Sequence, residues 1–416
     1  MTTHEATVEH IAGSLSRQPS VLSVVIPAYN EEAGIGAIVN RVLNARAALA
    51  EVGIDDLELI VVDDGSSDRT AQIVEEYPQV RLIRHPVNKG YGAALKTGFG
   101  AARGDLLAFL DADGTYPAEY LPQLCVCALE GADLVVGSRR SGSNSEMPLV
   151  RRVGNLIWST LVSLLSNHRV IDPASGMRVF RRAVFECLCP LPDGLNFTPV
   201  MSTRAVHEGL RMVEVPISYQ ERTGASKLSV VRDGTRFLHT IIWTSLAYNP
   251  VRLLGGMGMI LCAFGGSIGA ALIAMRLRGI TTLGPWGIAS TFLAVVLVFA
   301  GVDLLALGSA FNYLVSLFHK KPVGQGFFRS PLFHTALDRH FWWLGAIGVV
   351  AGLALNISSL ALALGGWSLE RLWLYLLAGT MLLLLGVQLA VFWLIMRVLE
   401  ELSHRDVLVQ ADMGLS

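Results

Sequence analysis

Four long apolar stretches dominate the second half of the sequence, at roughly residues 251–275, 285–312, 341–365 and 371–397. A helix needs about 20 mainly apolar residues to cross the hydrocarbon core of a bilayer, and each stretch is long enough. The first 230 residues or so have the composition of a soluble enzyme. We therefore expect a soluble domain followed by a membrane domain with four transmembrane helices.

The expected organisation is a tail at 1–20, a catalytic domain at 21–228, a juxtamembrane helix at 229–250, the membrane domain at 251–400 and a second tail at 401–416. The first tail has no apolar core of the kind that a signal peptide needs. The loop after the second apolar stretch carries Lys320, Lys321, Arg329 and Arg339. Positive-inside reasoning places this loop, the catalytic domain and both termini in the cytoplasm.

The net charge and the apolar stretches bear on two classes of partner, nucleic acid and the lipid bilayer. The formal net charge is -1, which gives no whole-chain case for nucleic-acid binding. The apolar stretches instead make the bilayer the expected partner. We expect a multi-pass protein of a prokaryotic plasma membrane, and a homo-oligomer is a possible assembly.

Strand and helix patterns alternate along the first domain. Apolar, β-branched runs predict strands at 21–27, 57–62, 80–84 and 106–110, and helical periodicity predicts helices at 35–48, from 71 onward and at 92–102. This alternation is typical of an α/β, Rossmann-like domain with a mostly parallel sheet covered on both faces. Ligands of such sheets bind beyond the carboxyl ends of the strands.

Polar residues follow each of the four predicted strands, at 29–32, 63–68, 88–90 and 111–113. Any one of these clusters could be an ordinary turn or a helix cap. Because the carboxyl ends of parallel strands meet at one edge of the sheet, together they predict a binding site rich in carboxylates.

Asp111 and Asp113 are candidate metal ligands. If the chain is still extended there, positions i and i+2 point to the same side and the two carboxylates repel one another. A hard ion such as Mg²⁺ or Mn²⁺ relieves that repulsion and completes its shell with substrate phosphates. A pair of solvated turn aspartates is the alternative.

The segments VVIPAYNEE, VVDDGSSDRT, NKGYGAA and LDADGTYP resemble, in this order, the family 2 glycosyltransferases of the GT-A fold. VVGSRR, DPASGMRVF and ERTGASKLS narrow the resemblance to the polyprenyl-phosphate glycosyltransferases, the group that contains dolichyl-phosphate mannose synthase. The resemblance covers roughly residues 21–245. It implies inverting transfer of a single sugar from a nucleotide-sugar, of the GDP-mannose or UDP-glucose type, to a dolichyl or undecaprenyl phosphate, with Mg²⁺ or Mn²⁺ as cofactor.

The resemblance also implies roles for individual residues. The expected nucleotide-sugar contacts are Pro27, Tyr29, Glu31, Asp63, Asp64, Lys89, Asp111, Arg222 and Lys227. The expected catalytic residues are Asp113, which shares the metal with Asp111, and Arg139, Arg152 and Arg178, which orient the acceptor phosphate. Thr115 stands where mannose-transferring relatives usually have glutamine, which weakens mannose as the sugar.

Two segments of the sequence suit the membrane interface. Residues 151–165 and 235–246 are too short to cross a bilayer, carry tryptophan and have an apolar side. Ordinary helices packed within the domain are the competing interpretation.

A faint internal repeat relates two halves of the membrane domain. LGGMG recurs as LGAIG and GVDLLAL as GVQLAVF, so Asp303 and Gln388 occupy equivalent positions. We expect an interhelical hydrogen bond from these polar groups, with proton relay as the alternative.

Two rival functions share part of this pattern. Processive polysaccharide synthases carry a Gln-x-x-Arg-Trp motif, which this sequence lacks. A lipid-linked sugar flippase with a degenerate cytoplasmic domain would not need the intact aspartates of the predicted donor site.

Overall fold

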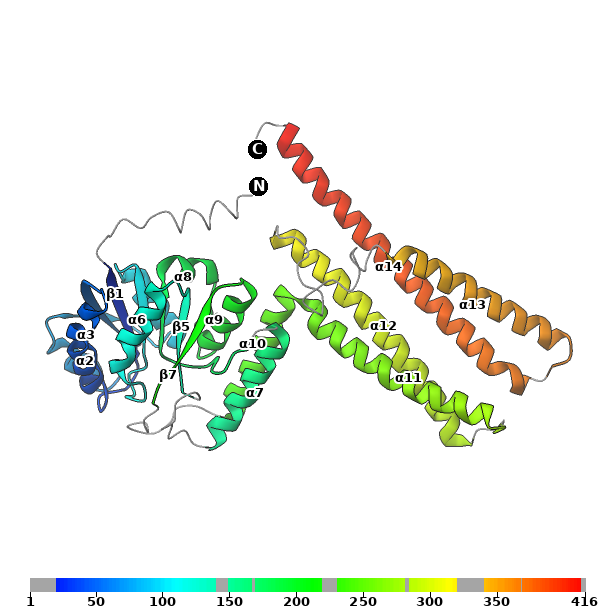
Figure 1. The fold of residues 1–416 in the computed structure, drawn as a ribbon, viewed down its shortest axis with the longest axis horizontal. Coiled ribbons are helices and arrows are strands. Elements are labelled where there is room, and N and C mark those ends of the chain that lie inside the picture. The colour runs from blue at the N-terminus through cyan, green and yellow to red at the C-terminus, as the bar shows by residue number, and fades with distance from the viewer. Residues whose placement is uncertain are drawn as a thin grey trace. The chain divides into compact units, whose positions relative to one another are not determined.

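The computed structural model describes residues 20–139, 149–166, 169–218, 230–280, 284–319, 340–367 and 369–412. The chain divides into two compact units, Met1–Thr244 and Ser245–Ser416. The first unit is an α/β domain and the second consists of long helices (Figure 1). The predicted fold class is therefore confirmed.

A seven-stranded sheet in the order β3-β2-β1-β4-β6-β5-β7 forms the centre of the first unit. The strands are β1 (Val21–Ala28), β2 (Asp56–Asp63), β3 (Val80–Arg84), β4 (Leu106–Phe109), β5 (Leu134–Ser138), β6 (Arg178–Arg181) and β7 (Met212–Pro216). The first four strands are parallel, whereas β6 runs antiparallel to both β4 and β5.

Helices connect and follow the strands, and the last of them extends past Thr244 into the second unit. They are α2 (Ile35–Asn44), α3 (Arg46–Glu51), α4 (Thr70–Glu75), α5 (Tyr91–Ala101), the short η1 (Ala118–Tyr120), α6 (Leu121–Leu129), α7 (Leu149–Ser166), α8 (Arg182–Leu188), α9 (Phe197–His207) and α10 (Val230–Tyr248). The helix expected at 35–48 is two helices, which break at Ala45.

The sheet has a hydrophobic core on each face, because side chains alternate along a strand. In β1, Val24 and Ile26 pack in one core with α2 and α6, whereas Val25 packs in the other with α5 and α9. All three side chains have no exposed surface. Two covered faces leave the ends of the strands as the exposed parts of the sheet, and the predicted site lies at their carboxyl ends.

The second unit contains the π-helical turn η2 (Val251–Gly255) and the helices α11 (Gly256–Leu277), α12 (Pro285–His319), α13 (Phe341–Leu364) and α14 (Leu369–Asp412). The predicted spans fall at Val251–Leu277, Pro285–Asn312, Phe341–Leu364 and Leu372–Glu401, each long and apolar enough to cross a bilayer. Helices α11 and α12 lie side by side, as do α13 and α14 (Figure 1).

Glycines bring the two helices of each hairpin into close approach. A Cβ atom added to Gly258 would lie 2.5 Å from the carbonyl oxygen of Gly301, and one added to Gly348 would lie 3.0 Å from the Cα of Gly386. These glycines occupy equivalent positions of the internal repeat, so both hairpins use the same type of contact.

The two hairpins also meet through polar groups. Gln388 Nε2 on α14 donates a hydrogen bond of 2.8 Å to Asp303 Oδ1 on α12. The predicted interhelical hydrogen bond is therefore confirmed. Because the two residues are equivalent in the repeat, the bond joins matching positions of the two hairpins.

Candidate active site

The loops after β1 and β2 are tied together by hydrogen bonds. The Asn30 backbone N–H donates to Ser66 Oγ at 2.9 Å, and Asn30 Oδ1 accepts from the Ser67 N–H at 2.8 Å. Asn30 adopts a positive φ of 52°, a conformation that asparagine tolerates better than most residues. The Glu31 N–H donates to Thr70 Oγ1 at 2.9 Å. Two of the predicted polar clusters are therefore parts of one rigid rim.

The predicted nucleoside contacts lie along this rim. Pro27 and Ala28 pair with the last residues of β2, so the end of β1 lies beside Asp63. Asp63 is 4% exposed, and its Oδ1 accepts from the Ser66 N–H at 3.0 Å. Tyr29 follows β1 and is 40% exposed, and Glu31 is half-buried. An exposed ring next to a carboxylate is a suitable surface for stacking and hydrogen bonding of a base.

The carboxylate of Asp64 organises the loop before α5. Its Oδ1 accepts from the Lys89 N–H at 2.9 Å and lies 2.7 Å from His85 Nδ1, and its Oδ2 accepts from the Gly90 N–H at 2.8 Å. Asp64 and His85 are 3% and 6% exposed. The side chain of Lys89 is exposed at the same turn. The sequence predicted Asp64 and Lys89 as site residues but not His85. The position of His85 directly after the third strand could have indicated that it lies at the same end of the sheet.

Asp111 follows β4 and faces the start of α5. The Tyr91 hydroxyl donates to Asp111 Oδ1 at 2.7 Å. Burial, together with the negative charge of Asp111, raises the pKa of Tyr91 well above its usual value, so the hydroxyl stays protonated and remains a donor. A Cβ added to Gly176 would overlap the Asp111 carboxylate. The sequence reasoning missed both Tyr91 and Gly176.

Asp113 lies in a turn and not in an extended strand. β4 ends at Phe109, and Gly114 has a φ of 75°. Asp113 Oδ1 accepts from both the N–H and the hydroxyl of Thr115, at 3.2 and 2.6 Å. The chain is therefore not extended at Asp113, because side chain–backbone bonding of an aspartate favours a turn, and the condition under which both carboxylates would point to the same side is not met.

The donor set of this turn is small. Among the residues that the structure describes, no group of three or more histidine, cysteine, aspartate or glutamate side chains could hold a metal ion. Asp111 and Asp113 supply two carboxylates from one turn, and both are half-buried. This donor set suits an ion such as Mg²⁺, which keeps several waters and takes further oxygens from substrate phosphates.

Arg139 is held by a buried partner. Its Nε and Nη2 donate to the two carboxylate oxygens of Asp172 at 2.8 and 2.7 Å, and its backbone N–H donates to Asp172 Oδ2 at 3.0 Å. The Asn155 amide donates to Asp172 Oδ1 at 2.8 Å. Burial alone would raise the pKa of Asp172, but the Arg139 charge and these hydrogen bonds hold that pKa below its usual value.

Arg178 and Arg152 have opposite surroundings. Arg178 has no exposed surface, and its Nη2 donates to the carbonyl oxygens of Pro173 and Thr198 at 2.7 and 3.0 Å. Arg152, on α7, is exposed. Arg222 and Lys227 lie outside the residues that the structure describes.

An apolar stripe runs along α7 on its exposed side. Val153, Ile157 and Leu164 are 55%, 55% and 73% exposed. Trp243 on α10 is 60% exposed. Leu165, near the end of α7, is buried.

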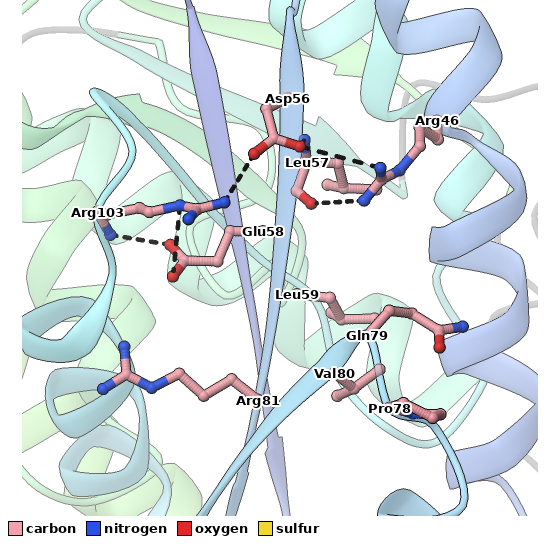
Figure 2. Close-up of a pocket in the computed structure, with 10 residues that line it drawn as sticks. All are labelled: Arg46, Asp56, Leu57, Glu58, Leu59, Pro78, Gln79, Val80, Arg81 and Arg103. Atoms are coloured by element: carbon pink, nitrogen blue, oxygen red, sulfur yellow. Dashed lines mark hydrogen bonds and ion pairs between the residues drawn. The ribbon is translucent and has the colours of Figure 1, made fainter.

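A shallow cavity of about 280 Å³ lies at the opposite edge of the sheet, beside the first residues of β2 (Figure 2). Asp56 is 2.7 Å from Arg103 and 3.9 Å from Arg46, and Arg103 also lies 3.9 Å from Glu58. Four of the charged groups that line this cavity thus pair with one another, and the fifth, Arg81, donates to the carbonyl oxygen of Ala101. Because it adjoins the amino end of β2, it is not the place where parallel sheets of this type bind ligands.

Comparisons with known proteins bear on both units. Residues 23–189 match the family described as glycosyl transferase family 2, and residues 250–410 match a domain of unknown function. A protein from Photorhabdus laumondii subsp. laumondii is 30% identical over 304 residues, which are 72% of this chain and 90% of that protein. A protein from Salmonella choleraesuis is 30% identical over 307 residues, which are 72% of this chain and 89% of its own length. Both are named undecaprenyl-phosphate 4-deoxy-4-formamido-L-arabinose transferase.

A solved structure also resembles part of the chain. Glucosyl-3-phosphoglycerate synthase from Mycobacterium tuberculosis, in complex with Mn²⁺, UDP and glucosyl-3-phosphoglycerate, is 24% identical with a TM-score of 0.43. The match covers 54% of this chain and 80% of that one.

Proposed function

Because the chain belongs to glycosyl transferase family 2, we propose that it moves one sugar from a nucleotide-sugar to a polyprenyl phosphate, of which undecaprenyl phosphate is the first candidate. The names of its relatives from Photorhabdus and Salmonella support this acceptor. The observation in the chain itself that carries the proposal is the Asp111–Asp113 turn, held against the start of α5 by Tyr91.

The carboxylates of this turn would hold a divalent metal. One oxygen of each carboxylate is oriented by a hydroxyl donor, Asp111 by Tyr91 and Asp113 by Thr115. Gly176 leaves room for the Asp111 carboxylate, where any larger residue would displace it. When bound, Mg²⁺ or Mn²⁺ supplies positive charge that stabilises the leaving nucleoside diphosphate.

The rim formed by the loops after β1 and β2 would hold the nucleoside. Asp63 is oriented by the Ser66 N–H, and Tyr29 offers an exposed ring beside it. Lys89 is exposed on the turn that Asp64 and His85 hold in place. In this proposal Asp64 positions the turn, because its carboxylate is buried and already bonded within the protein.

The transfer requires no strong general base. The phosphate of the acceptor is already anionic at neutral pH, so one of its oxygens can bond to the anomeric carbon as the bond to the donor diphosphate breaks. Inversion at that carbon follows from a single displacement. The protein's contribution is then positioning and charge stabilisation. Tyr91 is not a base in this scheme, because its raised pKa keeps the hydroxyl protonated.

The three arginines expected at the acceptor take different roles in this proposal. Arg152 is exposed on the helix that carries the apolar stripe of Val153, Ile157 and Leu164, which suits contact with a lipid phosphate at a membrane surface. Arg178 has no exposed surface, so we assign it a positioning role in place of acceptor contact. Arg139 is paired with the buried carboxylate of Asp172, so we assign it a positioning role as well.

The test of this function is direct. The purified full-length protein is incubated with undecaprenyl phosphate, Mn²⁺ and a panel of UDP- and GDP-sugars that includes 4-deoxy-4-formamido-L-arabinose as the sugar. We expect a lipid product heavier by one sugar, identified by mass spectrometry. A ladder of longer products would instead indicate a processive synthase, and no product with any donor would contradict the proposal.

A further inference from the structure

The side chain of Arg252 is buried at the start of the first predicted span. Arg252 lies in η2, and only 8% of its surface is exposed. Its Nε and Nη2 atoms are buried and have no hydrogen-bond partner among the residues that the structure describes. A buried guanidinium left without an anion is strongly unfavourable, especially next to a bilayer. Within the described part of the chain, this cation therefore has no anion to pair with.

Ser245, seven residues before Arg252, provides a second unpartnered group. Its hydroxyl is buried, has no partner in the described part of the chain, and belongs to a residue that is 1% exposed. The Asn249 N–H donates to the Ser245 carbonyl at 2.7 Å, and the Arg252 N–H donates to the Asn249 carbonyl at 3.3 Å. Helix α10 ends at Tyr248 and η2 begins at Val251, so Ser245 lies in the last turn of α10 and Arg252 in the turn that follows the break at Asn249. Two buried donor side chains thus lie seven positions apart in the sequence, on either side of this break.

The backbone that carries Arg252 is fixed by packing. η2 lies against α12, where a Cβ added to Gly308 would be 3.2 Å from the Cα of Val251 and 3.1 Å from the Cβ of Leu254. The carboxylate of Asp303, on the same helix α12, accepts a hydrogen bond from Gln388. The guanidinium thus projects from a held turn, at the first residues of a span, where the phosphate groups of a bilayer lie.

We propose that Arg252 and Ser245 bind the phosphate group of a membrane lipid at the start of the first span. The planar guanidinium offers two parallel N–H donors, which match two phosphate oxygens, and the serine hydroxyl can donate to another oxygen. Basic pockets between membrane helices bind lipid headgroups in this way. This site lies in the second unit and does not depend on the sugar-transfer proposal.

Native mass spectrometry of the full-length protein in detergent tests the site. Phosphatidylglycerol is titrated against the wild-type protein, Arg252→Gln and Arg278→Gln, the last removing an exposed arginine just after α11. We expect one tightly retained phosphatidylglycerol in the wild type and in Arg278→Gln. Arg252→Gln should bind it about tenfold more weakly or worse, since a bidentate charge-assisted contact is lost. Equal retention by all three proteins would overturn the proposal.

Further arms identify the source of the phosphate and guard against misfolding. Farnesyl phosphate that displaces phosphatidylglycerol at low concentration would assign the site to the acceptor lipid, and failure to displace it would assign a bulk phospholipid. Displacement by inorganic phosphate at equal concentration would overturn the lipid assignment. Should Arg252→Gln not fold, Ser245→Ala and Arg252→Lys replace it, and both must weaken phosphatidylglycerol binding while the thermal unfolding temperature in lipid-free detergent is retained.

Discussion

The Tyr91 hydroxyl lies 2.7 Å from Oδ1 of Asp111 and joins the first residue of α5 to the end of β4. Through this bond, the loop that Asp64 organises and the proposed metal turn are parts of one assembly. Tyr91 is buried deeply enough that its pKa lies well above the usual value, so the bond persists throughout the neutral range.

Replacing Tyr91 with phenylalanine should weaken metal use while keeping the fold. The aromatic ring still packs, but Asp111 loses the donor that orients it, and such losses typically cost about 10- to 100-fold in metal affinity or activity. The measurement is the Mn²⁺ concentration that gives half-maximal transfer. Tyr77→Phe is the matched control. It also removes a tyrosine hydroxyl, but that hydroxyl accepts a hydrogen bond of 2.8 Å from the side-chain amide of Asn40 on α2 and does not contact Asp111 or Asp113 in the described hydrogen bonds. Equal Mn²⁺ dependence in both variants would exclude a positioning role for Tyr91.

Gly176→Ala should displace Asp111. The added Cβ would overlap the carboxylate, so either Asp111 or the loop of Gly176 must move. We expect transfer to fall by about 100-fold or more, as misplacement of a reacting group by about 1 Å can cause. The comparison is Gly100→Ala in α5, where the new methyl group meets nothing within 4 Å. That variant should keep full activity and unfold at an unchanged or higher temperature. An active Gly176→Ala enzyme would show that Asp111 need not keep its observed position.

The Arg139–Asp172 pair predicts a pH dependence of stability. The pKa of Asp172 in the folded protein lies below its ordinary value of 3.8, despite burial, because Arg139 and hydrogen bonds favour the charged form. The stabilisation is therefore fully present above about pH 3.8 and is lost as the pH falls through the lower, folded-state pKa. Asp172→Asn should lower the free energy of unfolding by about 3 kcal/mol at neutral pH, by leaving a partly buried arginine unpaired.

Thermal unfolding of the detergent-solubilised protein at neutral and acidic pH measures this effect. Asp56→Asn serves as control, because Asp56 forms an exposed pair with Arg103 that should contribute less than about 1 kcal/mol. A loss of similar size in both variants at neutral pH would refute the special contribution of Asp172.

The hydrogen bond between Gln388 and Asp303 should tolerate exchange of its partners. Because the residues are equivalent in the internal repeat, the double variant Asp303→Gln with Gln388→Asp can rebuild the bond with its polarity reversed. Gln388→Leu should cost about 1 kcal/mol, in line with interhelical hydrogen bonds in membranes. Thermal unfolding in detergent compares the three proteins. If the double variant is no more stable than Gln388→Leu, the two positions are not interchangeable.

The sequence predicted the fold well because the apolar runs of its strands and of its membrane helices are distinct in length. Buried parallel strands such as β1 are short, continuous apolar runs, and the membrane helices are long ones. The antiparallel strand β6 was missed, because Arg178 at its start was interpreted as part of a motif. Pairing direction depends on contacts with β4 and β5 that no local pattern encodes.

The sequence proposed residues for the candidate site, but it did not predict how they are arranged. Asp111 and Asp113 were predicted on the condition that the chain stays extended there, whereas Thr115 closes a turn on Asp113. Tyr91 bonds to Asp111 and His85 lies against Asp64, and in each pair the two residues come from different segments of the chain. The order of the strands in the sheet brings these segments together. A sequence contains the residue types of such a network, while the tertiary fold decides the partners.

The most direct test of the proposed donor site is lipid-linked sugar formation by the wild type and Asp113→Asn over a titration of Mn²⁺, starting from protein stripped of metal with EDTA. Asn at position 113 keeps the size of the side chain and can still accept from Thr115, but it removes the charge. We predict that the wild type forms product only when Mn²⁺ or Mg²⁺ is restored, and that Asp113→Asn forms less than about 1% as much at saturating metal. Full activity of the stripped wild type, or wild-type rates for Asp113→Asn, would contradict the assignment of the Asp111–Asp113 turn as the metal and diphosphate site.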